Sequence, residues 1–128
     1  MNINHIGIWT NNLEGLREFY CEYFGAKSNE KYINPVKQFS SYFLRFENGE
    51  CSVEIMSKPN LDNLFENVNN TGLAHFAFSV GSIEDVDLFT NRLRDAGYKV
   101  IGEPRLTGDG FYESAIGDPD GNIVEITV

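Results

Sequence analysis

Two histidines and two glutamates stand at repeating positions in this sequence, and their side chains could together bind a metal. The histidines, His5 and His75, are the only two in the chain, and each begins an apolar run. Glu54 follows His5 by 49 residues, and Glu125 follows His75 by 50. Both glutamates have apolar neighbours, in "SVEIM" and "IVEIT". Because a carboxylate buried in a sheet is costly unless it is paired or metal-bound, we expect one shared ligand set.

Two imidazoles and two carboxylates suit a divalent transition metal. Imidazole nitrogen and carboxylate oxygen are ligands that Zn, Ni, Co, Mn and Fe(II) accept. Two carboxylates neutralise one doubly charged ion, and four protein ligands leave about two positions open in an octahedral site. Open positions are typical of a catalytic metal. Taken singly, each of these residues is as well explained as a packed or solvated strand residue, so the interpretation depends on the four occurring together.

Alternation along the strands predicts which other side chains share the ligand face. With a period of two, His5 and Trp9 lie opposite the large apolar residues of their strand. Met56 and Thr127 each follow a glutamate by two residues and fall on the same face as that glutamate. We therefore expect Trp9 and Met56 to line a substrate-binding cleft, with Thr127 beside it.

The two ligand pairs belong to two copies of one pattern. Residues 5–27 and 75–99 each read as a strand, a polar turn and an amphipathic helix. Asn11 or Asn12 is expected to cap the first helix, and Ser82 the second. Strand-rich sequence follows each helix, so each copy predicts a strand, a helix and about three strands. We expect the helix of each copy to cover one face of its sheet, and the other faces of the two sheets to close around a cleft.

Hairpin signals and a polar connection complete the organisation. Asn48–Gly49 and Asp120–Gly121 are turn sequences that join the last two strands of each copy. The polar residues 58–71 are the predicted connection, with a short helix around Leu61 to Val68. The repeat has a period near 70 residues, and two copies are too few for a solenoid.

Composition and net charge exclude some classes of binding partner. The chain has 128 residues, 41% of them hydrophobic, and a formal net charge of -9, which together indicate one acidic globular domain. Nucleic acid and anionic membranes need a basic face, so neither is an expected partner. No apolar run approaches a membrane span and no signal peptide is visible. Cys21 and Cys51 form no disulfide framework or CxxC motif, so we expect reduced thiols in a cytoplasmic protein.

Three stretches match a known family. With "HIGIWTNNLEGLREFYCEYFGA", "GLAHFAFSV" and "GDPDGNIVEI", the sequence resembles the vicinal oxygen chelate superfamily, which includes glyoxalase I, fosfomycin resistance proteins, extradiol dioxygenases and bleomycin resistance proteins. The resemblance implies an α+β fold, in which two βαβββ modules form an open, mixed-sheet barrel around a metal cleft. It implies one domain over 1–128, with module one at about 1–57, the connection at 58–71 and module two at 72–128.

The family's ligand positions fall on the four residues already singled out. The resemblance implies that His5, Glu54, His75 and Glu125 bind one divalent metal, with Ni, Co or Zn expected. This order of ligands is similar to glyoxalase I. Related epimerases usually have glutamine at the second position, and fosfomycin-resistance transferases and extradiol dioxygenases generally use three protein ligands.

The glyoxalase branch implies a metal-dependent lyase or isomerase that detoxifies methylglyoxal. Such an enzyme converts the hemithioacetal of a 2-oxoaldehyde and a thiol into a 2-hydroxyacyl thioester, with Glu54 or Glu125 as catalytic base. Trp9 stands where glutathione-dependent members commonly carry arginine, so the thiol stays open. The alternatives are a metal-dependent thiol transferase of the fosfomycin-resistance type and a non-catalytic small-molecule binding protein. Family members are often dimers, so a homodimer is expected, and modules that pair within one chain or across two chains are both open.

Overall fold

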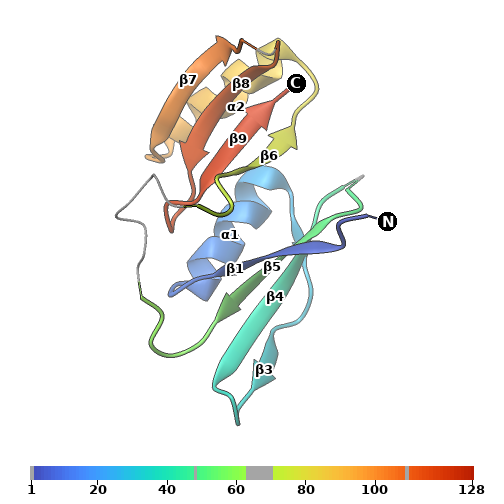
Figure 1. Cartoon of the computed structure of the whole chain (residues 1–128), viewed down its shortest axis with the longest axis vertical. Coiled ribbons are helices and arrows are strands. Elements are labelled where there is room, and N and C mark those ends of the chain that lie inside the picture. Colours follow the sequence, from blue (N-terminus) through green and yellow to red (C-terminus); the bar gives the residue numbers. More distant parts are fainter. Residues whose placement is uncertain (1, 48, 63–70, 109) are drawn as a thin grey trace. The chain divides into compact units, whose positions relative to one another are not determined.

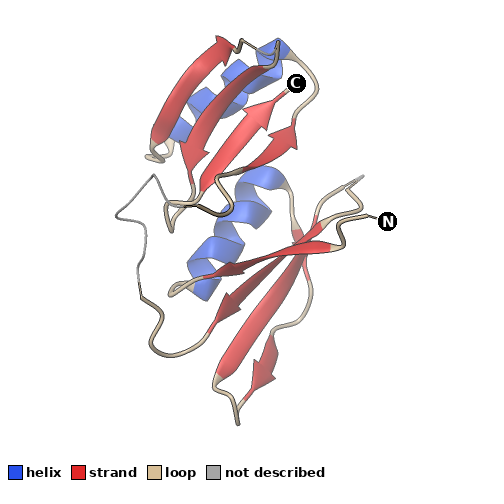
Figure 2. Cartoon of the chain, viewed as in Figure 1, coloured by secondary structure: helices blue, strands red, loops and turns tan. Residues whose placement is uncertain are grey.

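The chain divides into two compact units, each built of one mixed sheet and one helix in its described part. The computed structural model describes residues 2–47, 49–62, 71–108 and 110–128. The units are Met1–Leu64 and Phe65–Val128 (Figure 1). Figure 2 shows strands and a helix in both, so the predicted α+β class is confirmed. Asn48 and most of the predicted short helix at 61–68 lie outside the described residues.

The first unit follows the predicted order with one difference. Its sheet runs β1–β5–β4–β2, with β3 also paired to β4, and only the β1–β5 pair is parallel. Two short strands, β2 and β3, occupy the place where a single strand was expected. The elements are β1 (His5–Trp9), α1 (Leu13–Phe24), β2 (Lys27–Ser28), β3 (Tyr32–Asn34), β4 (Phe39–Arg45) and β5 (Ser52–Ser57).

Helix α1 covers one face of this sheet. Asn12 is its N-cap, and its side chain accepts a hydrogen bond from the Gly15 amide at 3.1 Å, which decides between the two predicted caps. The helix ends at Gly25, whose φ of 66° is the left-handed conformation that glycine adopts without strain. The residues buried between helix and sheet are Ile8, Leu13, Leu16, Phe19, Tyr20, Tyr42, Leu44, Val53 and Ile55.

The second unit repeats the strand, helix and three-strand order as predicted. Its sheet runs β6–β9–β8–β7, with a parallel β6–β9 pair, and Figure 1 shows α2 along one face of these four strands. Ser82 caps α2 as expected, since its hydroxyl accepts a hydrogen bond from the Asp85 amide at 3.1 Å. The elements are β6 (Phe76–Ser79), α2 (Ile83–Asp95), β7 (Val100–Leu106), β8 (Tyr112–Gly117) and β9 (Ile123–Thr127).

The "DPDGN" turn between β8 and β9 is held by a buried carboxylate. Asp118 is 5% exposed and accepts hydrogen bonds from the Asp120 amide, the Asn122 amide and the Asn122 side chain at 3.0, 2.9 and 2.8 Å. Gly121 takes a φ of 86°, which the turn needs. The turn fixes the β8–β9 register and with it the position of Glu125.

One buried polar contact was not predicted from periodicity. Thr90 of α2 is fully buried, and its hydroxyl bonds the Val86 carbonyl and the Ser114 hydroxyl, both at 2.6 Å. Phe89, the large apolar neighbour of Thr90 on α2, is only half-buried. Among the described residues, no helix combines the length and the apolar character that crossing a membrane requires.

Candidate metal centre

His5 and Glu54 lie together on the face of the first sheet that α1 leaves open. The Nε2 atom of His5 is 3.9 Å from the Oε2 atom of Glu54, and their side chains are 42% and 17% exposed. The His5 ring packs edge-on against Phe43 with centroids 5.4 Å apart. Its Nδ1 atom is 3.0 Å from the Asn4 side-chain oxygen. That oxygen can only accept, so this contact fits a protonated Nδ1 and leaves the Nε2 lone pair towards Glu54.

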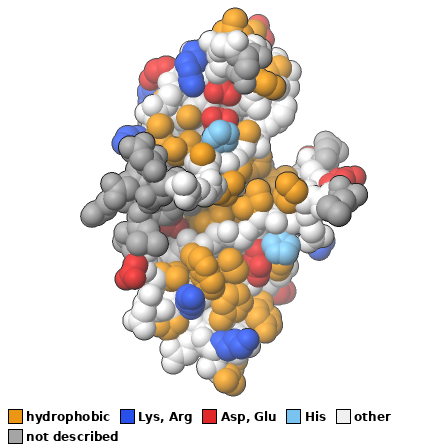
Figure 3. All heavy atoms as spheres, in the orientation of Figure 1, with side chains coloured by type: hydrophobic (Ala, Val, Ile, Leu, Met, Phe, Trp, Pro, Cys, Tyr) orange, Lys and Arg blue, Asp and Glu red, His pale blue; other side chains and the backbone are white. Residues whose placement is uncertain are grey.

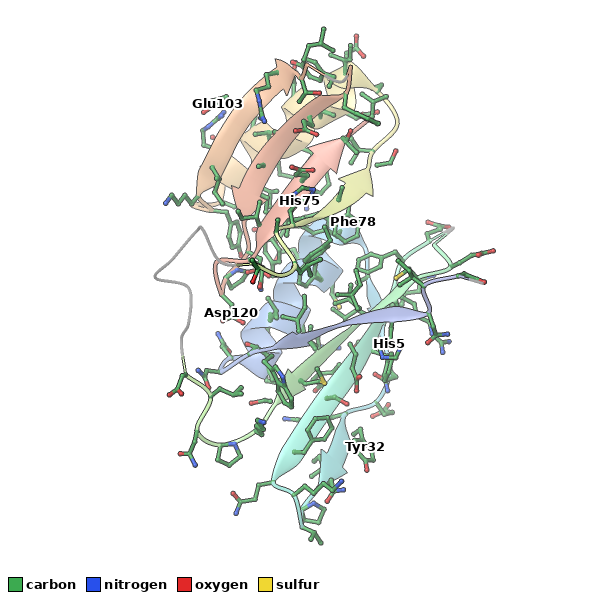
Figure 4. All side chains as sticks on the ribbon, in the orientation of Figure 1. His5, Tyr32, His75, Phe78, Glu103 and Asp120 are labelled. Atoms are coloured by element: carbon green, nitrogen blue, oxygen red, sulfur yellow. The ribbon has the colours of Figure 1, made fainter. Side chains whose placement is uncertain are left out.

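The second unit brings His75 and Glu125 together in the same way. His75 lies one residue before β6, and its Nε2 atom is 3.1 Å from the Oε2 atom of Glu125. The side chains are 47% and 18% exposed. They line an open hollow of about 470 Å³ whose other walls include Ala115 and Ile123. Figure 4 labels both histidines, and Figure 3 shows each of them, in pale blue, with acidic and hydrophobic side chains beside it.

A shared strand register produces both pairs. In each unit the histidine strand runs parallel to the glutamate strand, and the residue paired with the glutamate is two positions after the histidine: Gly7 with Glu54, and Ala77 with Glu125. Side chains two apart on a strand share a face. The small residue at the pairing position therefore leaves the histidine and the glutamate side chains free to approach each other.

The donor atoms of each pair fit one metal ion. Nitrogen and oxygen ligands about 2.1 Å from the same ion stand roughly 3 Å apart when they are neighbours in its coordination sphere. His75 and Glu125 already meet that spacing at 3.1 Å, while His5 and Glu54, at 3.9 Å, need only a small side-chain movement. Within the described parts of the chain, no three histidine, cysteine or acidic side chains gather as a metal-binding cluster. Each unit thus supplies two of the four predicted ligands.

Trp9 and Met56 lie on the open face of the first unit, as alternation predicted. Trp9 is 44% exposed, and its ring meets Phe39 edge-on with centroids 6.1 Å apart. Met56 pairs with Trp9 in the strand register. A Cβ atom on Gly7 would stand 2.9 Å from the Met56 methyl group, so the glycine leaves room for Met56 over β1. In the second unit, Thr127 occupies the position that corresponds to Met56, and its hydroxyl donates to the Tyr112 carbonyl at 3.3 Å.

Two neighbours of Trp9 and His5 were not predicted from the sequence. The Lys58 ammonium lies 4.4 Å from the centre of the Trp9 ring, a cation–π contact. Lys58 was assigned to the polar connection, although Glu54, Met56 and Lys58 alternate and therefore share a face. Phe43 was not singled out from the sequence, yet it pairs with Glu54 in the strand register and its ring packs against the His5 ring.

Comparison with known proteins identifies the family. The model of the Glyoxalase/Bleomycin resistance protein/Dioxygenase superfamily matches residues 2–126. The chain belongs to this superfamily. Its members are mostly enzymes that act on small molecules, and they generally bind a divalent metal.

Individual relatives differ in their stated activities. The chain is 33% identical to the trivalent organoarsenical cleaving enzyme of Bacillus sp. (strain MD1), over 95% of this chain and 70% of that protein. It is 28% identical to a probable lactoylglutathione lyase of Synechocystis sp., over 98% of this chain and 94% of that protein. Among solved structures, glyoxalase I from Zea mays matches with a TM-score of 0.79 and 25% identity, over 98% of this chain and 44% of the maize chain.

Proposed function

We propose that this protein is a metal-dependent isomerase of the glyoxalase I type. Its substrate would be the hemithioacetal formed from a 2-oxoaldehyde and a thiol, and its product a 2-hydroxyacyl thioester. The observation that supports this function is the duplicated pair: His5 with Glu54 and His75 with Glu125, each within 3.9 Å and each with a largely buried carboxylate. The similarity to a probable lactoylglutathione lyase and to maize glyoxalase I supports the same reaction class.

The four side chains would hold one divalent metal, with Ni, Co or Zn the expected ions. When bound, such a metal would supply Lewis-acid polarisation of the substrate's neighbouring oxygens. The chain's own part is proton transfer. Glu54 or Glu125 removes the proton from the carbon that carries sulfur and hydroxyl and returns it to the adjacent carbonyl carbon, while the hydroxyl proton passes to the former carbonyl oxygen. The carbon bonded to sulfur is oxidised by two electrons and its neighbour is reduced by two, so no external oxidant or reductant is needed.

The open face of the first unit supplies binding surface for this reaction. Trp9 and Met56 form an apolar wall on the same face as His5 and Glu54. Apolar walls around a few polar groups are typical of small-molecule sites. They would hold the carbon chain of the aldehyde and exclude water from the carbon acid during proton transfer.

Cleavage of an organoarsenical is a second candidate, because the relative with that activity is 33% identical. Trivalent arsenic is a soft centre that binds thiolates, and soft centres favour sulfur ligands. The chain has only two cysteines. Cys21 lies on α1, and Cys51 precedes β5 with its thiol directed at the Ser52 carbonyl, so neither belongs to the open-face set. The isomerase is therefore the function that the side chains support better.

The proposed function is tested by a metal-resolved activity screen. The purified full chain is loaded with Ni, Co or Zn, and methylglyoxal is supplied with several low-molecular-weight thiols. Thioester formation is followed by ultraviolet absorbance and mass spectrometry. Glu54→Gln and Glu125→Gln should each abolish turnover, whereas Glu84→Gln, the same change at an exposed position of α2, should not. Normal isomerase rates in both site variants would show that the mechanism is wrong.

The same screen separates the remaining alternatives. A thiol transferase of the fosfomycin-resistance type would give a covalent thiol adduct of an epoxide, visible by mass spectrometry. A binding protein would show ligand affinity without turnover and without a stoichiometric metal. A homodimer acting in the cytoplasm is part of the proposal, and light scattering of the purified protein would measure the assembly.

A further inference from the structure

His5 has two neighbours that restrain its ring. The side-chain oxygen of Asn4 is 3.0 Å from the Nδ1 atom of His5. That oxygen can only accept, so it selects the form of the neutral ring in which Nδ1 carries the proton. Phe43, the register partner of Glu54, packs edge-on against the imidazole with ring centroids 5.4 Å apart and limits its rotation. Together the two neighbours keep the Nε2 lone pair of His5 available on the open face of the first unit.

His75 lacks both restraints, because alanine occupies both corresponding positions of the second unit. Ala74 precedes His75 in the sequence, and Ala115 is the register partner of Glu125. Both alanines line the open hollow of about 470 Å³ beside His75. Among the described residues, no side-chain oxygen accepts a hydrogen bond from the Nδ1 atom of His75. The duplicated histidines are therefore held unequally.

The distances to the two glutamates predict opposite proton positions on the neutral rings. The Nε2 atom of His75 is 3.1 Å from the Oε2 atom of Glu125. A lone pair at that distance from a carboxylate oxygen is repelled, so the carboxylate favours a proton on Nε2. The corresponding distance between His5 and Glu54 is 3.9 Å, which is beyond hydrogen-bond range. In the metal-free chain, His5 therefore presents a free Nε2 lone pair, whereas a proton blocks that of His75.

We propose that His5 is the preorganised first ligand of the metal site, that Asn4 is the positioning residue that fixes its proton, and that His75 joins last. The inference rests on the proposed function, because it takes the four side chains as one metal site. Before His75 binds through Nε2, the proton on that atom leaves to water and another is taken up at Nδ1, so the ring stays neutral. This exchange, and the ordering of a ring without restraints, subtract from the affinity that His75 contributes.

Nitrogen NMR of the metal-free chain is the first test. Long-range proton–nitrogen spectra at about pH 9, where an ordinary imidazole is neutral, show which ring nitrogen carries the proton. The chain has only two histidines, and the spectrum of His75→Ala assigns them. We expect the Nδ1–H form at His5 and the Nε2–H form at His75. Asn4→Ala should move His5 towards a mixture of both forms, whereas Asn4→Asp, which keeps an oxygen acceptor, should retain the Nδ1–H form.

Metal affinity is the second test, and the second unit offers a matched gain-of-function variant. The probe is Zn alone, and its Kd is measured by competition with a chelating dye. Asn4→Ala should raise the Kd about tenfold, the low end for losing a group that orients a metal ligand. Ala74→Asn places the same acceptor before His75, so it should move that proton towards Nδ1 and lower the Kd. Asn2→Ala makes the control change at an exposed position and should alter neither the spectra nor the Kd.

Single-ligand variants test the unequal contributions of the two histidines. Because His5 is held ready and His75 is not, the loss of His5 should weaken binding more. We expect the Kd for Zn to be about tenfold larger in His5→Ala than in His75→Ala. Equal values, or the reverse order, would contradict the inference.

The outcomes separate the inference from the proposed function. Zn binding with the expected inequality, without turnover of any hemithioacetal, supports the inference and contradicts the isomerase. Turnover by a chain whose two histidines show the same proton position contradicts the inference alone. An unchanged His5 spectrum and Kd in Asn4→Ala also overturn it, and a chain that binds no Zn, Co or Ni overturns both. If Asn4→Ala unfolds, Ala74→Asn decides, because an unmoved His75 proton with no gain in affinity overturns the inference.

Discussion

Metal stoichiometry tests whether the two pairs act as one site. A shared site made of His5, Glu54, His75 and Glu125 binds one ion per chain. Two independent pairs would bind two ions per chain, each with only two protein ligands. The perturbations are His5→Ala, His75→Ala and the double variant, which remove the ligating nitrogen and put no other donor in its place, all made in the full chain. The assay is metal content after desalting, together with thermal unfolding in the presence and absence of Ni, Co or Zn.

The stabilisation expected from metal binding is clearly larger than the contribution of the histidine–glutamate pairs without metal. A metal present at about 100 times its Kd stabilises the fold by about 2.7 kcal/mol. For a chain of this length, 1 kcal/mol moves Tm by roughly 4 °C, so the metal should raise Tm by about 10 °C. Without metal, each histidine is 42% or 47% exposed beside its glutamate, and such a half-exposed pair contributes at most about 1 kcal/mol. The variants should therefore unfold almost like wild type until metal is added.

The loss of the metal-induced rise in Tm in each variant distinguishes a shared site from two independent sites. In a shared site, His5→Ala and His75→Ala each remove most of the metal-induced rise in Tm, and the double variant adds little, because residues that act as a unit are not additive. In independent sites, each single variant keeps one ion and about half of the rise, and the double variant loses both. Two ions in wild type with one retained in each single variant would refute the shared site.

Three further outcomes follow from the structure. Asp118→Ala should lower the free energy of unfolding by about 2–3 kcal/mol in denaturant melts, because three donors lose a buried charged acceptor. A hydrogen bond from Lys31 lowers the pKa of Glu14, so its contribution is present above the ordinary glutamate range and is lost as pH falls through the lowered value. Glu14→Gln should therefore cost less than about 1 kcal/mol at pH 7, and the difference from wild type should vanish in acid and shrink in high salt. Trp9→Ala should raise KM in the isomerase assay with little change in Tm, because Trp9 is 44% exposed.

The sequence predicts the second unit better than the first, and the reason lies in local signals. The second unit has a capping serine, a helix with buried Val86 and Leu93, and a "DPDGN" turn, and each signal is short-range. In the first unit, the segment after α1 pairs with β4 as two short strands, Lys27–Ser28 and Tyr32–Asn34. That break depends on how the strand meets a neighbour distant in sequence, which periodicity does not report.

The sheet face that a side chain takes could be predicted on the regular strands β1 and β5, but not on the irregular strand β7. Alternation placed His5, Trp9 and Met56 on one face because β1 and β5 keep an unbroken register. Strict alternation would put Gly102 and Arg105 on opposite faces, whereas they pair with Ala115 and Glu113, which share one face of β8, because a bulge in β7 adds a residue between them. Gly102 and Pro104 are the local signals, since both residue types concentrate at bulges. They indicate that a strand is irregular but not which face its next residue takes.

The family signature "GDPDGN" has a structural role, yet it determines the position of Glu125. Asp118 has no part in the proposed proton transfer, but its three hydrogen bonds fix the turn that sets β9 against β8. That register pairs Ala115 with Glu125, and the parallel β6–β9 register then pairs Ala77 with Glu125. A slip of one residue would turn Glu125 to the helix-covered face and bury its carboxylate among apolar side chains. The turn therefore positions Glu125 through two strand registers, and this explains why a motif without catalytic groups accompanies the glutamate that we propose as a metal ligand.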